Sequence, residues 1–520
     1  MTSDIQLETL EAKGLIRLAT IRPELEYLFR HALVQDAAYG SLLKQERRTL
    51  HGQVGEALEQ LYPERRAELS PVLAMHFEQA GETEKAIEYY TAGARLALGR
   101  FAIQEAYAAF DRASALIEQV GDSDGATAAD QPADESLRRR RRAIEVALGR
   151  ADAGYSFRAP EESFDALERI VPDAEELGDI ELLGRVHMLI ALGRLQNGEG
   201  PDAPLVKRSL DRIGELGKLV GDPSMRAMPT ALIGMSQVFA GPVPAGVAAL
   251  EESLPLIEGH QATIGAAFAR GALAIGYASL GEFDKADAAA AKATEIAGNG
   301  DLIAQLDALI AQSFVELLRG NLDRAVPFAR ECVERSEETG ASACMVVSTW
   351  ILGDAFHRQG QFEEARDVLK RGSEISLVVD RKVWRPTLQA WLGSATAALG
   401  GVETDDFDEA LATSRSIGNQ VGESLVLSKR AETLAARGDI DAASRDFEGS
   451  ARLMEQNAAR PWLARLLRTW GEALRAAGRN DDAEPILRRS LDLFEELALD
   501  REAGIVRTAL SVGPTKLAFD

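Results

Sequence analysis

Seven glycines recur at an almost constant interval through the second half of the 520-residue chain. Consecutive members of this series lie 38 to 40 residues apart. Each is preceded and followed by a stretch of apolar residues at helical spacing, which predicts two helices joined by a tight turn at the glycine. The glycines are Gly241, Gly281, Gly320, Gly360, Gly400, Gly438 and Gly478. A period held over seven turns predicts a stack of helical hairpins, because each hairpin must bury its apolar face on a neighbour.

Small residues recur in register with these glycines. Five residues after a turn glycine the chain has Gly246, Ala286, Ala325, Ala365, Ala443 and Ala483, and twelve after it Ser253, Ala293, Cys332, Gly372, Ser450 and Ser490. Small side chains let two helix axes approach closely, so these positions should lie where the second helix crosses the first. The repeat at Gly400 departs from the pattern, since its alanine is Ala410 and GVETD forms an insertion in the turn.

The stretch Trp350 to Ile375, WILGDAFHRQGQFEEARDVLKRGSEI, resembles the tetratricopeptide repeat, a helix–turn–helix unit that stacks into a superhelix. The resemblance implies an all-α fold, a tetratricopeptide-like helical-repeat superhelix or α-solenoid. Because the period exceeds the usual 34 residues, the helices should be longer than in that family.

The N-terminal part of the sequence has a different pattern. LETLEAKG predicts a short helix ending at Gly14, LIRLAT and ELEYLF predict a β-hairpin, and a long amphipathic stretch follows with a break near Gly40-Ser41. We therefore divide the chain into 1–62, a small winged-helix remnant with a linking helix, and 63–120, the first helical repeats. Residues 121–136 form a flexible acidic loop, and 137–520 form the superhelix, whose last polar residues Arg501, Glu502 and Arg507 should face water.

The segment GLI followed by YLFRHALVQDAAYGSLLKQERRTLHGQVGEAL resembles a junction found in large bacterial signalling proteins. Those proteins combine a class III nucleotide cyclase or another output domain with a STAND-type ATPase, a winged helix and helical repeats. The resemblance implies that this chain corresponds to their C-terminal part, since it contains neither a GxxxxGK[ST] phosphate loop nor a cyclase metal-binding motif.

Composition narrows the possible partners and the location. The formal charge of −24 argues against nucleic acid, because an acidic chain repels phosphate backbones. The sequence has no apolar run long enough to cross a membrane and no N-terminal signal region, which predicts a cytoplasmic protein without a membrane partner. Two cysteines, Cys332 and Cys344, cannot form a disulfide framework, and the alternative to two reduced thiols is one regulatory disulfide.

The chain shows no arrangement of residues typical of an enzyme. None of the six histidines forms a metal-spaced pair, and His357 with Asp354 is the nearest approach to a polar pair on one helical face. Without a third ligand or a nucleophile–base set, we predict no catalytic residue, metal or cofactor.

Binding is expected on the concave groove, which in the tetratricopeptide family is lined by the first helix of each hairpin. Carried over by register, groove positions fall three, six, ten and thirteen residues before each turn glycine. The candidates are Asp307, Phe314, Trp350, Asp354, His357, Glu432, Arg465, Arg468, Glu472 and Arg475. The arginines at the C-terminal end could bind a carboxylate-bearing segment, or could pair with Glu472 and neighbouring acids. The tryptophans Trp384, Trp391, Trp462 and Trp470 are expected in the core.

A second candidate for binding is the run of five arginines after the acidic loop, Arg138, Arg139, Arg140, Arg141 and Arg142. It could bind an anion or an acidic partner. It could equally be the solvated start of a helix, although cations are unfavourable at that end of a helix dipole.

These features predict a non-enzymatic protein-interaction or sensor module of a bacterial signalling or transcription-regulatory ATPase system. It would bind a protein or peptide segment in the superhelical groove. One alternative is sensing of a small-molecule effector, which a compact apolar pocket would favour over an open groove. Another is that the chain is the regulatory part of a nucleotide cyclase.

Overall fold

The computed structural model describes residues 2–20, 26–123, 133–155, 157–158, 160–258, 263–298, 302–401 and 405–511. The chain divides into two compact units. Unit 1 consists of Met1–Leu96 and Ala108–Asp130, and unit 2 of Ala97–Tyr107 and Gln131–Asp520. Nearly all regular structure in the described residues is helical, which confirms the predicted all-α fold with a small N-terminal hairpin.

Unit 1 begins with the predicted order of helix, hairpin and helices. Helix α1 (Thr2–Ala12) is followed by the antiparallel strands β1 (Ile16–Thr20) and β2 (Glu26–Phe29), and α2 (Ala32–Ser41) and α3 (Lys44–Leu61) come next. The break between α2 and α3 lies where the sequence predicted it. A 3₁₀ turn η1 (Pro63–Arg65), α4 (Arg66–Ala80), α5 (Thr83–Gly99) and α6 (Ile103–Ser123) follow, and the turn between α5 and α6 belongs to unit 2.

The acidic segment 121–136 contains more helix than we predicted. Helix α6 continues to Ser123, and α7 already begins at Ala133. Glu135 forms an ion pair with Arg139 one turn later, 3.5 Å apart, and an acidic residue in the first turn favours a helix start. Residues 124–132 lie outside the described part of the chain.

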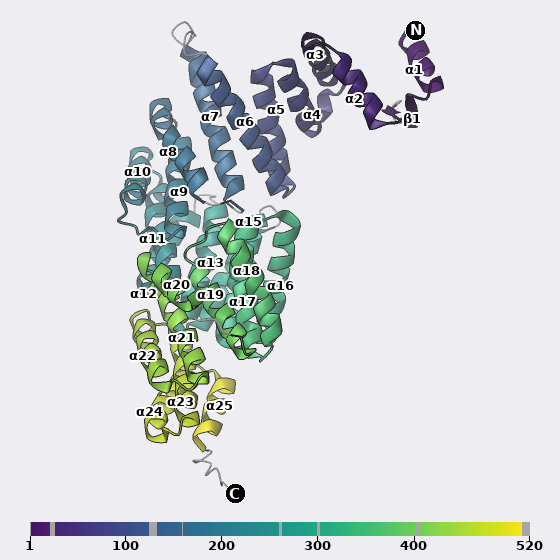
Figure 1. The fold of residues 1–520 in the computed structure, drawn as a ribbon. Helices are drawn as coiled ribbons and strands as arrows, with labels where there is room; N and C mark the ends of the chain where they lie inside the picture. Colours follow the sequence, from purple (N-terminus) through teal and green to yellow (C-terminus); the bar gives the residue numbers. More distant parts are fainter. Residues whose placement is uncertain are drawn as a thin grey trace. The chain divides into compact units, whose positions relative to one another are not determined.

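Unit 2 is a run of antiparallel helical hairpins, which lie side by side in Figure 1. Its helices are α7 (Ala133–Gly154), α8 (Pro160–Leu177), α9 (Ile180–Gln196), α10 (Pro204–Val220), α11 (Pro223–Ala240), α12 (Val243–Glu258), α13 (Thr263–Leu280), α14 (Phe283–Ala297), α15 (Leu302–Arg319), α16 (Leu322–Thr339), α17 (Ser342–Arg358), α18 (Phe362–Val378), α19 (Arg385–Ala398), α20 (Asp405–Ser416), α21 (Gln420–Ala436), α22 (Ile440–Gln456), α23 (Arg460–Ala476), α24 (Asn480–Glu496) and α25 (Asp500–Ser511).

The seven predicted turn glycines all lie between two helices and all have a positive φ angle. Their φ angles lie between 74° and 97°, a region that only glycine enters without steric cost. At Gly360 the glycine amide donates to the His357 carbonyl and the Gln361 amide donates to the Phe356 carbonyl, which satisfies the last carbonyls of α17. The predicted repeat register is therefore confirmed.

The small residues lie where the two helices of a hairpin cross. Ala286, Ala325, Ala365, Ala443 and Ala483 are fully buried. At the second small position, Ser450 and Ser490 donate hydrogen bonds to carbonyls of the first helix 26 residues earlier, at 2.6 and 2.7 Å. Side chains larger than these would separate the helices. Ala410 is equally buried, so the repeat at Gly400 keeps its packing, and insertion residues 402–404 lie outside the described residues.

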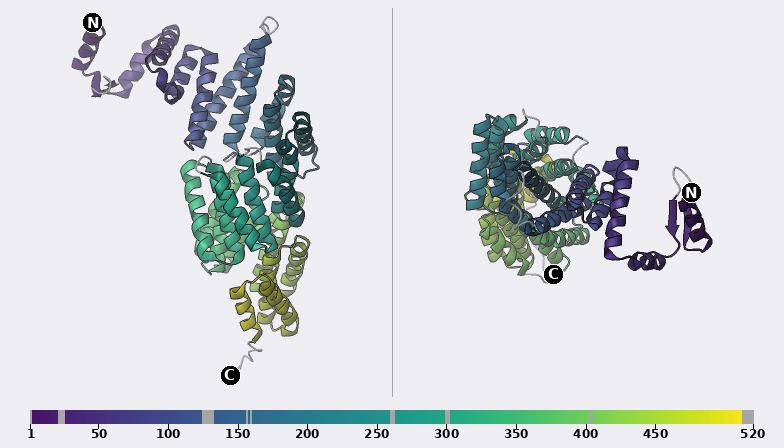
Figure 2. Two further views of the ribbon diagram at one scale, coloured as in Figure 1. Left: turned by 180° about the vertical axis from the view of Figure 1, so that it is seen from behind. Right: turned by 90° about the horizontal axis from the view of Figure 1, so that it is seen from above.

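Helices far apart in the sequence meet inside unit 2. Helix α11 contacts α21, and α13 and α15 contact α23. The Asn457 side-chain oxygen accepts from the Val243 amide at 3.3 Å, and Arg465 donates to the Leu318 carbonyl at 2.7 Å. The helices of unit 2 are thus arranged around a common centre, as the view from above in Figure 2 shows. Because the helices of unit 2 wind around this centre, part of the concave groove predicted from the sequence is closed.

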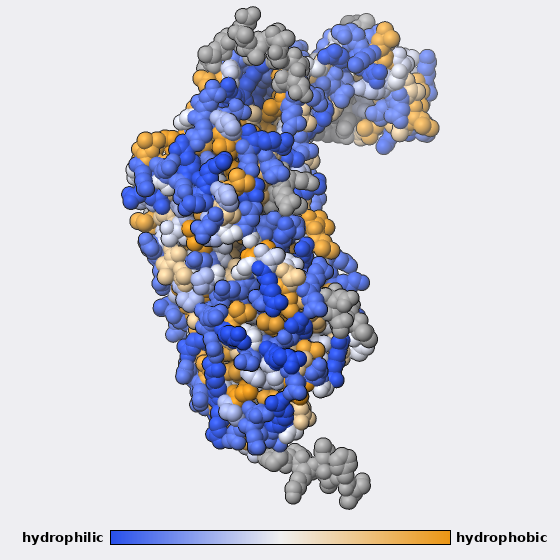
Figure 3. Space-filling view, turned by 60° about the vertical axis from the view of Figure 1, so that its left-hand side comes forward, coloured by the Kyte–Doolittle hydropathy of each residue, from blue (hydrophilic) through white to orange (hydrophobic). Residues whose placement is uncertain are grey.

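The outer surface is mainly hydrophilic on the face drawn in Figure 3, where hydrophobic residues lie in small groups among charged ones. Among the described residues, no helix combines the length and the apolar character that crossing a membrane requires.

Candidate ligand-binding cavity

Among the cavities on the concave side of unit 2, two are lined mainly by the first helices of the hairpins. The larger has a volume of about 1040 Å³ and lies among α7, α9, α11, α13, α15 and α17. The smaller, of about 270 Å³, lies among α17, α19, α21, α23 and α25. The register places several predicted groove residues on these walls. Asp307 lines the larger cavity, whereas Asp354, His357, Glu432, Arg465 and Arg468 line the smaller one.

The remaining predicted groove residues are not on the cavity walls. Trp350 is only 1% exposed and Phe314 5% exposed, so both belong to the core rather than to a binding surface. The Trp350 ring packs against Trp384, Trp391 and Trp462, with centroids 5.8 to 6.2 Å apart. These aromatic side chains fill the middle of the superhelix, which ends the larger cavity there. Glu472 is exposed, and Arg475 lies outside both cavities.

Most of the larger cavity is apolar. Its wall includes Met228, Ala231 and Met235 of α11 and Phe268, Gly271 and Ile275 of α13. Each of these six residues stands six, ten or thirteen residues before Gly241 or Gly281. The offsets used at the later glycines therefore identify them, but our groove candidates did not extend to the first two repeats. Closely packed methionines and aromatic rings give this wall an apolar and adaptable surface.

A group of polar side chains lies on the same wall and comes from segments far apart in the sequence. Arg381, before α19, donates to the Gln196 side-chain oxygen at 3.1 Å and to the Tyr155 backbone carbonyl. Its guanidinium lies 4.5 Å from the centre of the Tyr155 ring, a cation–π distance. Arg381 is only 4% exposed. It therefore joins the end of α7 and of α9 to a loop that follows about 190 to 230 residues later.

Three further charged residues line this cavity: Asp152 and Arg185, which form an ion pair at 3.0 Å, and Asp307. Desolvation by the surrounding protein raises the pKa of the Asp152 carboxyl group, and the positive charge of Arg185 opposes that shift. Burial raises the pKa of the Tyr155 hydroxyl and of the Cys344 thiol, and the negative charge of Asp307 acts in the same direction. Tyrosine and cysteine on this wall are thus uncharged near neutral pH.

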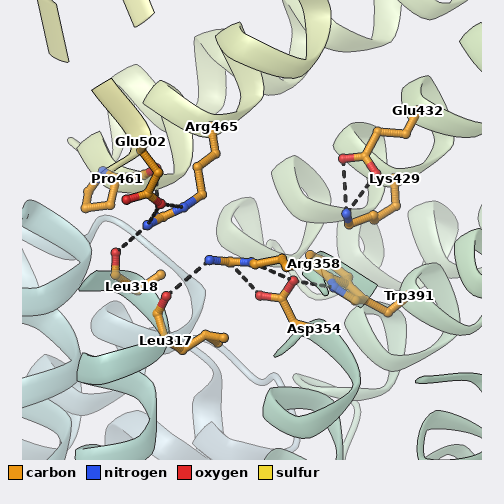
Figure 4. A network of polar contacts seen from close by, with 10 residues as sticks. All are labelled: Leu317, Leu318, Asp354, Arg358, Trp391, Lys429, Glu432, Pro461, Arg465 and Glu502. Carbon is orange, nitrogen blue, oxygen red and sulfur yellow. Dashed lines mark hydrogen bonds and ion pairs between the residues drawn. The ribbon is translucent and has the colours of Figure 1, made fainter. Parts of the chain in front are cut away.

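The smaller cavity is bordered by a network of ion pairs around the C-terminal end of α15. Figure 4 shows the guanidinium groups of Arg358 and Arg465 turned toward the carbonyl oxygens of Leu317 and Leu318. These carbonyls lie in the last turn of α15, where the helix dipole is negative and the Leu317 carbonyl also accepts from the Gly320 amide at 3.2 Å. Two arginines from other repeats therefore satisfy the end of this helix.

Each arginine of the network has its own carboxylate. Arg358 pairs with Asp354, whose Oδ1 also accepts from Nε1 of Trp391 at 3.0 Å. Burial alone would raise the pKa of Asp354, but the charges of Arg358 and Lys429 and these hydrogen bonds hold it below its ordinary value. Arg465 pairs with Glu502 at 2.9 Å, and burial, with the charge of Arg358, lowers the pKa of Arg465 to about 10. Glu502 thus faces inward, contrary to its expected exposure to water.

The arginines predicted to capture an acidic segment are engaged within the protein. Arg465 is 7% exposed and held by Glu502, Arg468 lies 3.9 Å from Glu472, and Arg475 donates to the Ala509 carbonyl. A buried guanidinium needs such partners, because burial of an uncompensated charge is costly. The structure therefore favours the alternative that these arginines pair with neighbouring groups of the same chain.

His357 lies at the edge of the smaller cavity and hydrogen-bonds to a neighbouring repeat. Its Nε2 is 3.0 Å from the Ser394 hydroxyl, and its ring contacts Phe362 edge to face. Burial, with the charge of Lys429, lowers the pKa of His357 to about 4. In the described residues, no three His, Cys, Asp or Glu side chains are grouped to hold a metal ion. Cys332 and Cys344 are buried free thiols.

The run of five arginines lies further inside a helix than we predicted. Arg138 is five residues after the start of α7, beyond the first turn, so the expected conflict with the helix dipole is small. Arg140 pairs with Glu176 of α8 and Arg141 with Asp179, which also caps the N-terminus of α9. The run thus joins α7 to the next two helices through exposed ion pairs.

Comparison with known proteins agrees with the helical repeats. The tetratricopeptide repeat family model matches residues 422–496, which form α21 to α24. An uncharacterized protein of Rhizobium meliloti (strain 1021) is 30% identical over 121 residues. The match covers 23% of this chain and only 12% of that protein's length.

Two solved structures match most of this chain, and the first of them has a similar fold. The crystal structure of a Rap protein complexed with Competence and Sporulation Factor matches with a TM-score of 0.51 and 14% identity, over 68% of this chain and 98% of that one. The Cut9 and Hcn1 hetero-tetramer structure from the APC/C matches with a TM-score of 0.44 and 13% identity, over 89% and 88% of the two chains. The helical hairpins, the family match and the fold shared with the Rap protein make unit 2 a tetratricopeptide-like solenoid, a type of repeat that mediates protein interactions.

Proposed function

We propose that this chain is a non-enzymatic sensor module that binds a short, mainly apolar ligand inside the superhelix of unit 2. The observation that carries this proposal is the apolar cavity of about 1040 Å³ on the inner wall of α9, α11, α13 and α15. Its volume is at the upper end of the range for small-molecule sites, and a few polar groups lie on an apolar wall, as is typical of such sites.

The form of the interior favours a short ligand over a long extended partner segment. Beyond the larger cavity the centre is filled by the tryptophan cluster, and the C-terminal part holds only the smaller cavity, which the ion pairs of Arg358 and Arg465 border. A long segment would have to displace these packed and charged groups. The similar fold of the Rap protein, solved as a complex with Competence and Sporulation Factor, supports a ligand-binding role.

The wider role we propose is regulation within a bacterial signalling protein. The resemblance of residues 1–62 and the following repeats to a winged-helix junction supports a place beside a STAND-type ATPase, or in a nucleotide cyclase as the alternative. A ligand that binds the closed superhelix more tightly than an open one would shift the population toward the closed form. The ligand would in this way change the activity of an associated output domain.

The direct test is binding of N-phenyl-1-naphthylamine, a neutral apolar dye whose fluorescence rises in an apolar environment. Gly265 lines the cavity, and a Cβ atom there would be 3.9 Å from the nearest atom, the Cε of Met228. Gly265→Phe should therefore place a ring in the cavity without breaking the helix, and should remove most of the saturable dye signal.

The matched control is Gly504→Phe in α25, where a Cβ atom would have no heavy atom within 4 Å. This variant adds the same ring to an open helix surface and should bind the dye as the wild type does. The proposal is wrong if the wild type shows no saturable binding, or if both variants lose it equally.

A further inference from the structure

Three cations are fully buried among the described residues of this protein, Arg381, Lys429 and Arg465. Lys429 pairs with Glu432 at 2.8 Å, and Arg465 pairs with Glu502. Arg381 differs, because its hydrogen bonds go to two neutral acceptors, the Gln196 side chain and the Tyr155 carbonyl. Within the described part of the chain, no carboxylate forms an ion pair with it. A buried guanidinium without an anionic partner is unfavourable and marks a place where an anion would bind well.

The position of Arg381 makes this anion site part of the larger cavity. Arg381 lies on the cavity wall beside Trp384, and its hydrogen bonds to Gln196 and Tyr155 use two of its five N–H donors. The Tyr155 ring covers one face of the guanidinium and fixes its plane. A planar guanidinium held in this way suits the two oxygens of a carboxylate, which it can bind through two parallel hydrogen bonds.

Asp307 is an acidic residue whose charge affects an anion bound at Arg381. It lies on the same cavity wall as Arg381. Its negative charge raises the pKa of Tyr155 and of Cys344, whereas the positive charge of Arg381 lowers both. It is not within ion-pair distance of Arg381, so it balances the charge only through space. The negative charge of Asp307 would repel an anion bound to Arg381. Substitution of Arg381 should therefore weaken anion binding, and substitution of Asp307 should strengthen it.

We propose that the ligand of the larger cavity carries a carboxylate, which Arg381 binds while the apolar body of the ligand packs against α11 and α13. This inference rests on the proposed function, because it names the chemistry of the ligand in that cavity. Two kinds of molecule offer this chemistry: a fatty-acid-like organic acid, and a short apolar peptide with a free C-terminus.

The test compares acids with their neutral amides as competitors of the N-phenyl-1-naphthylamine signal that Gly265→Phe removes. Decanoate is paired with decanamide, and an N-acetylated apolar hexapeptide with a free C-terminus is paired with its amidated form. We expect the wild type to prefer the acid in at least one pair by about ten- to hundredfold, the range for a hydrogen bond to a charged group. The pair that shows the preference identifies the source of the carboxylate.

Substitutions then assign the preference to one residue. Arg381→Gln should abolish the acid-over-amide ratio and leave amide binding near its wild-type value, and Asp307→Asn should increase the ratio. The control is Arg385→Gln, since Arg385 is a neighbouring arginine paired with Asp380 at 3.3 Å and does not line the cavity. Melting temperatures of all variants check folding, and the ratio separates carboxylate recognition from a merely structural role of Arg381.

The outcomes separate the inference from the proposed function. Equal binding of acid and amide to a wild type whose dye signal Gly265→Phe removes would overturn the carboxylate site and leave the cavity as a binding site. A ratio that Arg381→Gln leaves unchanged would do the same. Absence of any cavity-specific dye signal would overturn both proposals.

Discussion

At the scale of single residues, the inner wall of unit 2 is distinguished by buried charges whose partners come from other repeats. Arg465 reaches Glu502 of α25 and the Leu318 carbonyl of α15, so one side chain joins three helices. Removal of one partner from such a pair leaves a charge buried without compensation, which costs more than the pair itself contributes. The network should therefore be sensitive to single substitutions and tolerant of paired ones.

Glu502→Gln should lower the free energy of unfolding by about 3–5 kcal/mol, because it leaves the Arg465 guanidinium buried without an anion. Urea denaturation followed by circular dichroism measures this change. Replacing both residues, as Arg465→Met with Glu502→Leu, should restore most of the loss. The control is Glu496→Gln, which breaks the exposed ion pair with Arg460 and should change stability by less than about 1 kcal/mol. Equal effects of the two single substitutions would contradict this account of the network.

His357 should make stability depend on pH. Its pKa in the folded protein is about 4, below the ordinary 6.5, so the unfolded chain binds a proton over a range in which the folded protein does not. Stability from this group is therefore present above about pH 6.5 and is lost as the pH falls toward 4. Urea midpoints at pH 7.5 and 5.0 should differ less in His357→Gln than in the wild type, and an unchanged difference would rule out this role.

At the scale of elements, the hairpin could be predicted from the sequence in detail. A turn with positive φ favours glycine, and a close helix crossing requires small side chains. Both requirements therefore appear in the sequence as glycines and small residues at fixed spacing. The positions from Gly241 to Gly478 and the alanines five residues later were found for this reason. The helical residues 121–123 and 133–136 were missed because their small and acidic composition predicted a loop, whereas the ion pair of Glu135 with Arg139 favours helix at the start of α7.

Gly353 offers a test of the close crossing between α17 and α18. A Cβ atom at Gly353 would lie 2.4 Å from side-chain atoms of Leu369, so Gly353→Ala should destabilise the protein by about 1–3 kcal/mol despite its better helix propensity. Gly504→Ala, at an open position of α25, should instead stabilise the helix by up to about 1 kcal/mol. Thermal unfolding of both variants measures the difference, and changes of the same sign would show that crossing distance does not limit this position.

At the scale of the whole repeat unit, the sequence predicted which positions face inward but not what the interior contains. The period relates each hairpin to its neighbour about 40 residues away, whereas the contacts of Asn457 with Val243 and of Arg465 with Leu318 join residues 214 and 147 apart. No repeating signal encodes such contacts, because they depend on the small rotation accumulated over several hairpins. The accumulated rotation also determines where the aromatic cluster ends and the larger cavity begins. It therefore places Arg381, which lies outside the repeat register, on the cavity wall.

The measurement that tests the central claim most directly is photoaffinity labelling of the full chain with a diazirine derivative of decanoic acid, followed by mass-spectrometric mapping. The account predicts labels on peptides of α9, α11, α13 and α15 that contain cavity residues such as Met228, Met235 and Phe268, and their loss in Gly265→Phe. Labels confined to the outer helices α12, α16 and α18, or to unit 1, would contradict a binding site inside the superhelix.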